Sequence, residues 1–592
     1  MQKQNSASNL RQEKQIGRRT FIKTCGAFIG MLSITPSALA GLTSEPARIT
    51  ILVTSDLHGN ILGWDYLTAS PADVGLGKVY TLVKEEREKN PNTILIDNGD
   101  ILQGTPLDTY YSTINKGWKI HPMFEVFNAM NYDAIVLGNH EFNYGLDLLQ
   151  KAIAPSKAPV LSANTFDIKT AKTWKAVKSY TFKELRINGA VVTIGIIGLT
   201  TNAVPNWENA GNYAGLEFKD QVEILKKVIK EIKDKVDIII VASHSGIEID
   251  GQETIPGENQ IAAIAHSCPE VSLIIAGHKH ITIDNNNSVR NAKNKIVYDK
   301  GIINNIPVIE PNCWGKFLGK AELELAKIDG KWRLVNLTTS NITTKGVAED
   351  TAIIALAKPY HEATVKYLDT KIGTAAAEFT AVGGTIQNTP LVDLINKVQC
   401  YYGKAQLSAA ANFNPQAVIK QGDIKLQHIY SLYIYENYMY TIEITGSQLL
   451  KYLEHAARYY KQAIPGDAII STNYNGLPDY NYDMVAGVDY IIDITKPEGQ
   501  RIKNLTYNGE PVKGNDAFTL AINNYRANGG GGYMTAIGFR LGDDKSKIAF
   551  DSMKTCGDDG QVRNLIIRYI KEKRAISPVV SNNWKITTTP VD

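Results

Sequence analysis

Side chains that bind metal ions recur in this sequence, each time directly after a short apolar run. They stand in the patterns Asp-x-His, Gly-Asp, Gly-Asn-His-Glu, a single His, and Gly-His-x-His. Carboxylate and imidazole together suit Zn, Mn, Fe, Co or Ni, whereas Mg or Ca prefers a shell of oxygen atoms. The candidate ligands are Asp56, His58, Asp100, Asn139, His244, His278 and His280.

Seven ligands exceed the usual shell of one ion, so the sequence predicts two divalent cations that share Asp100. The charge of two such ions outweighs that of the two carboxylates, which favours an anionic phosphate ester as the substrate. Paired ions roughly 3.5 to 4 Å apart hold a nucleophile and the phosphoryl oxygens for in-line displacement. We therefore expect phosphoester hydrolysis. The first predicted site contains Asp56, His58 and His280, and the second contains Asn139, His244 and His278.

A further histidine stands beside one of these ligands. His140 follows Asn139 directly, so the two side chains need not point the same way. An imidazole that binds no metal could stabilise the transition state or protonate the leaving alkoxide. We predict that His140 is the catalytic acid.

The apolar runs before these motifs predict the strands of an α/β fold. Longer amphipathic stretches such as residues 221–235 separate them and predict helices. Ligand sites in open α/β sheets lie outside the carboxyl ends of the strands, so this fold can bring all the motifs to one edge. The predicted strands occupy residues 49–53, 93–96, 134–137, 191–197, 237–241 and 271–275.

With 592 residues, the chain is too long for a single core, which stops growing near roughly 250 to 300 residues. Hydrophobic residues make up 44% and charged residues 21%, which excludes a disordered, collagen-like or multi-span membrane chain. Residues 41–345 form the predicted metal-binding domain. A linker helix is expected within residues 346–371, and residues 372–592, rich in Tyr, Asn and Gly, form a second α/β domain.

Residues 1–40 have the pattern of a cleaved export signal. The apolar run over residues 25–34 is too short to cross a bilayer of about 30 Å, and Ala38 and Ala40 suit cleavage after Ala40. The pair Arg18-Arg19 resembles the twin-arginine signal, whose machinery carries folded proteins. We therefore expect an exported protein, periplasmic or extracellular, with that machinery as a transient partner and no stable membrane anchor.

Charge and cysteine content exclude two further classes. The net charge of +3 comes from the leader, because removing its six basic residues and one acidic residue leaves −2. A footprint for long nucleic acids is therefore not expected. The five cysteines are widely spaced without a Cys-x-x-Cys pair, so no disulfide framework is predicted.

The ordered metal-binding motifs resemble those of the calcineurin-like metallophosphoesterases over residues 48 to about 340. The second region resembles the C-terminal domain of secreted 5′-nucleotidases and periplasmic cyclic nucleotide phosphodiesterases. The resemblance implies a four-layer αββα metallophosphoesterase domain, followed by an α/β domain of the 5′-nucleotidase type. In that superfamily the second domain holds the nucleoside and rotates to bring it to the metals.

Two departures separate this chain from the 5′-nucleotidase branch. That branch has an Asp that orients the catalytic His, and here Asn143 takes its place, so we pair Asn143 with His140 as the catalytic residues. The branch also has an arginine that holds substrate, and residues 409–415 lack it. Residues 481–488 and 523–530 and the pair at 459–460 instead resemble the branch that hydrolyses 2′,3′-cyclic nucleotides.

This likeness implies how a nucleotide is held and converted. Tyr482 and Tyr525 would clamp the base between aromatic faces, at about 1 to 3 kcal/mol per stacked base, and Asn412 would also contact substrate. The implied enzyme converts 2′,3′-cyclic nucleotides to 3′-nucleotides and then to nucleoside and phosphate. The alternatives are a 5′-nucleotidase or UDP-sugar hydrolase, a thiosulfohydrolase on the same fold, and a non-catalytic nucleotide-binding protein with a decayed site.

Overall fold

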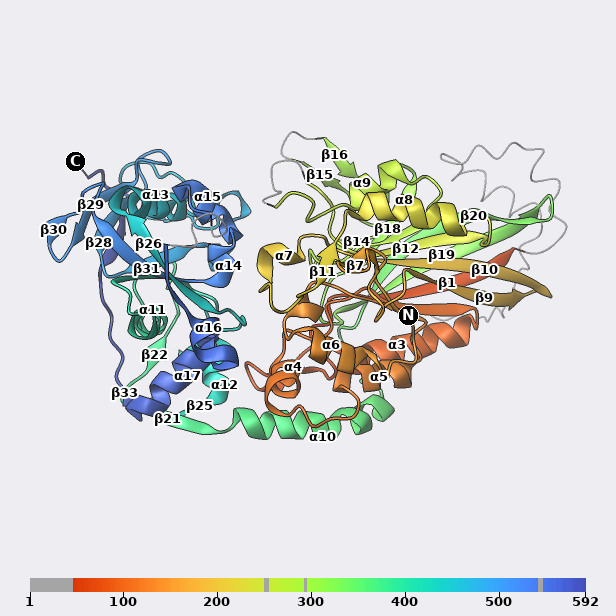
Figure 1. The fold of residues 1–592 in the computed structure, drawn as a ribbon, viewed down its shortest axis with the longest axis horizontal. Helices are drawn as coiled ribbons and strands as arrows, with labels where there is room; N and C mark the ends of the chain where they lie inside the picture. The colour runs from red at the N-terminus through yellow and green to blue at the C-terminus, as the bar shows by residue number, and fades with distance from the viewer. Residues whose placement is uncertain (1–45, 250–254, 292–294, 541–546, 592) are drawn as a thin grey trace, which may run out of the picture.

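The structure is a computed structural model that describes residues 46–249, 255–291, 295–540 and 547–591. Two lobes lie side by side, and the helix α10 (Thr351–Leu368) joins them along the lower edge in Figure 1. This helix lies within the predicted linker, residues 346–371, whereas the predicted leader lies outside the described residues. Among the described helices, none is long and apolar enough to cross a membrane.

Two sheets face each other in the N-terminal lobe. The first has the order β20 (Lys331–Thr343), β19 (Phe317–Ile328), β1 (Ala47–Thr54), β4 (Thr93–Asp97), β5 (Ala134–Val136) and β6 (Val160–Leu161). The second has the order β14 (Thr282–Ile283), β18 (Ile306–Pro311), β13 (Leu273–Ile275), β12 (Ile238–His244), β10 (Ala190–Thr200) and β9 (Tyr180–Ile187), with β17 (Ile302–Ile303) paired to β18. Apolar side chains of the two sheets, such as Ile51, Ile96 and Ile240, pack together in one core between them.

Helices cover the outer face of each sheet. The helices α3 (Leu76–Lys89), α5 (Pro122–Met130) and α6 (Leu146–Ile153) pack on the first sheet, and α8 (Gln221–Ile232) and α9 (Ile261–Ser267) pack on the second. This confirms the four-layer αββα arrangement, which is visible on the right of Figure 1.

Each of the predicted strands is present, and the central ones are parallel. Strands β1, β4 and β5 run parallel in the first sheet, and β10, β12 and β13 run parallel in the second. Strands buried on both faces read as near-continuous β-branched runs, which is why the sequence reveals them. The predicted helix at residues 221–235 corresponds to α8.

The C-terminal lobe is a second α/β unit, as predicted. Its main sheet has the order β27 (Asp483–Ala486), β23 (Leu407–Ala411), β31 (Ala517–Asn523), β26 (Met439–Thr445) and β32 (Ile548–Asp551). The helices α11 (Pro390–Gly403) and α13 (Gly446–Ala457) pack on this sheet, while α17 (Val562–Lys573) packs on α11.

Candidate metal centre

The five predicted motifs meet at one edge of the N-terminal lobe, where the parallel strands of both sheets end. Asp56 and His58 follow β1, Asp100 follows β4, and Asn139 follows β5, while His244 ends β12 and His278 and His280 follow β13. The ligand atoms within each of two groups lie within 4.8 Å of one another. The first group is Asp56, His58 and His280, and the second is Asp100, His244 and His278.

The two groups adjoin each other through Asp100. Its Oδ2 lies 3.0 Å from Nε2 of His244 and 3.9 Å from Nε2 of His58. Nε2 of His244 also lies 3.8 Å from Oδ1 of Asp56. Asp100 therefore has the position expected of a ligand shared by two ions.

The backbone at these ligands adopts a conformation that is rare for residues other than glycine. The φ angles are 53° at Asp56, 48° at His58, 59° at Asp100, 73° at His278 and 56° at His280. Such backbone costs of order 1 to 3 kcal/mol per residue and persists only where the surrounding structure imposes it. Its concentration at one edge indicates that the fold holds these side chains for a function.

Backbone carbonyl groups fix the orientation of two ligand imidazoles. Nδ1 of His58 lies 2.6 Å from the carbonyl oxygen of Gln103, and Nδ1 of His244 lies 2.7 Å from that of Asn98. Because the carbonyl oxygen can only accept, each Nδ1 carries a hydrogen, and each Nε2 is the ring atom available to a metal ion. Ligating histidines are oriented in this way in metal sites.

Glu141 holds together the two loops that carry Asp100 and Asn139. Its buried carboxylate accepts hydrogen bonds from the backbone N–H groups of Asp100 at 3.0 Å, Ile101 at 2.5 Å and Gly138 at 2.5 Å. The motif Gly-Asn-His-Glu thus supplies a ligand, a candidate acid and the carboxylate that fixes its neighbours.

The electrostatics of the site fit divalent cations. Burial would raise the pKa of Asp56, but His244 and His280 outweigh it and lower that pKa to about 2. Burial would lower the pKa of His244, but Asp100 and Asp56 outweigh it and raise that pKa to about 10. In addition, Oδ1 of the buried Asn139 has no hydrogen-bond partner among the described residues. Ionised carboxylates, oriented imidazoles and a free amide oxygen are a suitable donor set for two such ions.

His140 lies in the site beside the ligands. Its ring centroid is 5.3 Å from that of His58, and its backbone N–H donates to Oδ1 of Asp100 at 2.8 Å. Nδ1 of His140 lies 2.7 Å from Oδ1 of Asn143. The contact is short enough for the side chain of Asn143 to orient the imidazole of His140.

The structure corrects the predicted roles of Tyr482 and Asn412 in binding substrate. Tyr482 is fully buried and stacks on Tyr459, with ring centroids 4.7 Å apart. Asn412 is also buried, and its Nδ2 donates to the carbonyl oxygen of Ala381 at 2.8 Å. Neither side chain offers a surface to a substrate, because both belong to the packed interior of the C-terminal lobe.

Tyr525 has a different setting, at the boundary between the lobes. Figure 1 shows its helix, α14 (Asn524–Ala527), on the side of the C-terminal lobe that faces α7 (Val204–Trp207). Burial raises the pKa of Tyr525, and the negative charge of Glu258 in the other lobe adds to that rise. Oε1 of Glu258 in turn lies 3.1 Å from Nε2 of the candidate ligand His278.

Two more tyrosines that the sequence did not single out lie beside Tyr525. The ring centroids of Tyr435 and Tyr480 are 6.1 Å apart, and Tyr480 is 39% exposed. Burial raises the pKa of both side chains, and the nearby Tyr525 adds to the rise. We call Tyr435, Tyr480 and Tyr525 the boundary tyrosines. Among 29 tyrosines the sequence carries no signal that separates these from packed ones, and Glu258 likewise belongs to no motif.

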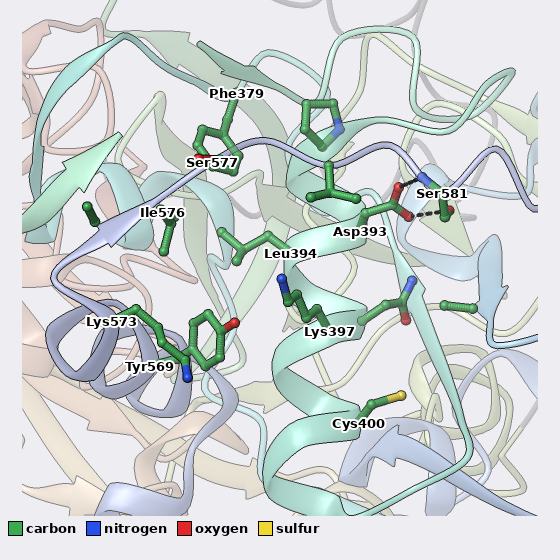
Figure 2. Close-up of a pocket in the computed structure, with 15 residues that line it drawn as sticks. Phe379, Asp393, Leu394, Lys397, Cys400, Tyr569, Lys573, Ile576, Ser577 and Ser581 are labelled. Atoms are coloured by element: carbon green, nitrogen blue, oxygen red, sulfur yellow. Dashed lines mark hydrogen bonds between the residues drawn. The ribbon is translucent and has the colours of Figure 1, made fainter. Parts of the chain in front are cut away.

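A hollow of about 460 Å³ lies elsewhere, between α11, α17 and the chain near Ser581 (Figure 2). Its walls are largely apolar, with Lys397 and Lys573 at the rim. At one end the carboxylate of Asp393 accepts hydrogen bonds from the backbone N–H of Ser581 at 2.7 Å and from its hydroxyl at 3.0 Å. None of the metal ligands lines this hollow, so the predicted chemistry does not take place there.

Two protein families match successive parts of the chain. Residues 49–282 match the calcineurin-like phosphoesterase family, and residues 371–537 match the 5′-nucleotidase C-terminal domain. The first match contains all seven predicted ligands, and the second contains the boundary tyrosines.

Three relatives extend the similarity over most of the chain. A Salmonella typhimurium 2′,3′-cyclic-nucleotide 2′-phosphodiesterase/3′-nucleotidase is 30% identical over 92% of this chain and 90% of its own length. The trifunctional nucleotide phosphoesterase protein YfkN of Bacillus subtilis is 31% identical over 94% of this chain, which spans only 40% of that relative. The solved structure of a candidate 5′-nucleotidase from Staphylococcus aureus is 25% identical, with a TM-score of 0.74 over 91% of this chain and all of the other. The chain therefore belongs to the 2′,3′-cyclic-nucleotide 2′-phosphodiesterase/3′-nucleotidase family of calcineurin-like metallophosphoesterases, and it is a phosphoric ester hydrolase.

Proposed function

We propose that this protein is an exported two-metal phosphoesterase that hydrolyses 2′,3′-cyclic nucleotides to 3′-nucleotides, and then 3′-nucleotides to nucleoside and phosphate. The observation that carries the proposal is the adjacency of two ligand groups with Asp100 between them. The names of relatives from Salmonella, Yersinia and Haemophilus support the substrate class.

The ligands would hold two ions of Zn, Mn, Fe, Co or Ni. When bound, such a pair lowers the pKa of water and neutralises charge on the phosphoryl group. His140 would give a proton from Nε2 to the leaving 2′ oxygen of the ribose, while Nδ1 keeps its hydrogen bonded to Oδ1 of Asn143. The same pair of residues would serve the second hydrolysis, in which the 3′ oxygen leaves.

A substrate panel tests the activity. We expect the purified enzyme, loaded with Mn or Zn, to release phosphate from 3′-AMP, and from 2′,3′-cyclic AMP by way of 3′-AMP. Asp100→Asn should abolish nearly all turnover, because it removes the charge of the ligand between the groups. Preference for 5′-AMP or UDP-glucose would support the alternative 5′-nucleotidase or UDP-sugar hydrolase instead, and turnover of S-sulfonated thiols would support a thiosulfohydrolase.

We propose that the boundary tyrosines bind the base, with Tyr435 and Tyr480 instead of Tyr482 as the partners of Tyr525. Tyr480 is 39% exposed and Tyr525 is half-buried, and the charge of Glu258 acts on both across the lobe boundary; such aromatic faces suit base stacking, which tolerates different bases. Tyr525→Ala should raise the KM for 2′,3′-cyclic AMP about ten-fold and leave that for bis(4-nitrophenyl) phosphate nearly unchanged. Tyr482→Phe is the matched control, because Tyr482 is buried. Equal changes for the two substrates would argue against stacking.

Export is proposed on the strength of residues 1–40. Changing Arg18 and Arg19 together to Lys should retain the full-length protein in the cytoplasm if the twin-arginine machinery carries it. Immunoblots of periplasmic and cytoplasmic fractions measure this. Undiminished export of the double variant would indicate a general secretory leader.

A further inference from the structure

We propose that Glu208 positions the catalytic imidazole of His140 through Asn143, which acts as a relay between the two. The inference rests on the proposed role of His140 as the acid. In this arrangement Glu208 supplies the carboxyl group that residue 143 lacks, and it does so from a loop 65 residues further along the chain.

The relay is a continuous chain of short contacts. Nδ1 of His140 lies 2.7 Å from Oδ1 of Asn143, and Nδ2 of Asn143 donates to Oε2 of Glu208 at 2.9 Å. Each end of the Asn143 amide is thus engaged by a different partner. The side chain of Asn143 has one acceptor end and one donor end, so its two partners together decide which way it faces.

Glu208 determines the orientation of the amide because its carboxyl group accepts from every described partner. Besides Nδ2 of Asn143, these partners are the backbone N–H of Asn209 at 2.6 Å and Nδ2 of Asn212 at 2.9 Å. With Nδ2 of Asn143 turned toward Glu208, Oδ1 must face His140. The imidazole then carries a hydrogen on Nδ1, as it must when it is protonated and ready to donate from Nε2.

A reversed amide would disable the acid. Nδ2 of Asn143 would then point its hydrogens at Nδ1 of His140, which favours a lone pair there and opposes the protonated ring. Removing Glu208 removes the partner that disfavours this reversal. The cost should therefore appear in proton donation to the leaving group.

Glu208 is itself held in place from several sides. Nδ2 of Asn212 donates both to Oε1 of Glu208 and, at 2.7 Å, to the backbone oxygen of Asn143. Nδ2 of the neighbouring Asn209 lies 2.7 Å from Sδ of Met553 in the C-terminal lobe. Burial raises the pKa of Glu208 to about 8, but both of its oxygen atoms accept in this geometry, which an amide at this position could not do.

The test compares two leaving groups in variants at both ends of the relay. 4-Nitrophenolate leaves without a proton, whereas a ribose alkoxide or phenolate needs one. Glu208→Leu should lower kcat at least ten-fold for 2′,3′-cyclic AMP and for diphenyl phosphate, but less than about three-fold for bis(4-nitrophenyl) phosphate. Glu208→Gln should share part of this loss, because its amide nitrogen cannot accept from the donor that faces it. Glu208→Ser, too short to reach Asn143, repeats the comparison if Leu prevents folding.

Asn143→Asp provides the decisive background, since it places a carboxylate directly against His140. Adding Glu208→Leu to Asn143→Asp should change kcat by less than about two-fold on any substrate. Equal losses on both classes of substrate, or the same effect of Glu208→Leu in both backgrounds, would overturn the proposal. A wild type that hydrolyses the phenyl esters but no nucleotide would defeat the proposed substrate class, while the phenyl ester comparison would still decide the role of Glu208.

Discussion

His121 is a buried histidine, distant in sequence from the metal ligands, whose ionisation is coupled to folding. Its Nδ1 accepts from the backbone N–H of Met123 at 3.4 Å, which caps α5. Burial lowers the pKa of His121 from 6.5 to about 3. Below pH 6.5 the unfolded chain therefore binds a proton that the folded protein does not, so the free energy of unfolding falls as the pH drops toward 3.

We predict that the free energy of unfolding of His121→Asn, which keeps an acceptor for the cap, depends less on pH than that of the wild type. The slopes of the two curves should differ by up to about 1.4 kcal/mol per pH unit below pH 6.5. Urea unfolding at a series of pH values measures this difference. Parallel curves would mean that His121 is already protonated in the folded protein.

The backbone at Gly138 lies so close to Asp100 that a side chain would not fit there. A Cβ at this position would lie 2.2 Å from Oδ1 of Asp100. We predict that Gly138→Ala displaces that carboxylate and lowers both metal content and kcat by at least ten-fold. Gly117→Ala, where the nearest atom would be 3.7 Å away, is the control. Metal analysis of the purified variants checks the prediction, and full metal content in Gly138→Ala would contradict it.

The sequence predicts the candidate ligands that the structure brings together, but not every residue that contacts them. The ligands could be found because each follows a strand and belongs to a short motif, which the chain direction brings to one edge. Tyr482 was assigned wrongly because a tyrosine that stacks in a core and one that stacks on a base have the same local pattern. Glu208 could not be found because its contact with Asn143 depends on tertiary packing between two loops.

The start of helix α10 depends on one capping carboxylate. Oδ1 of Asp350 accepts from the backbone N–H groups of Ala352 at 2.9 Å and Ile353 at 3.2 Å, and the carboxylate also pairs with Lys84 of α3. We predict that Asp350→Ala lowers the free energy of unfolding by about 1 to 2 kcal/mol, because it leaves these donors unpaired. Asp350→Asn should lower the free energy of unfolding by less, since Asn also caps helices. Chemical denaturation of both variants makes the comparison, and equal losses would point to the ion pair with Lys84.

The strands differ in how well the sequence reveals them. Strands β4, β5 and β12 are buried along their whole length and were predicted from apolar runs alone. The hairpin of β19 and β20 extends the same sheet but was not predicted. Its residues alternate between buried and exposed positions, and charged side chains interrupt the apolar ones. Its place beside β1 is fixed by antiparallel pairing with a strand more than 250 residues away.

The candidate ligands come from both sheets of the N-terminal lobe. Asp56 and Asp100 follow strands of the first sheet, whereas His244 ends a strand of the second. Bound ions would therefore link the sheets and stabilise only the folded state, by about 2.7 kcal/mol at a metal concentration 100-fold above Kd.

We predict that a chelator lowers the unfolding temperature of the protein and that added Zn or Mn restores it. Asp100→Asn should unfold at a temperature that depends much less on metal. Differential scanning calorimetry with and without chelator checks both expectations. An unchanged unfolding temperature in the wild type would mean that the ions do not bridge the sheets.

Helix α10 packs one apolar face against both lobes. Its buried residues Ile353, Ala357 and Leu368 share one apolar cluster with Phe127 of α5 and Ile566 of α17. The two halves of this chain are consequently poor candidates for separate expression. A fragment that stops before α10, or one that starts after it, would expose apolar surface that the helix covers in the full-length protein. Each fragment alone should therefore aggregate more readily than the full-length protein.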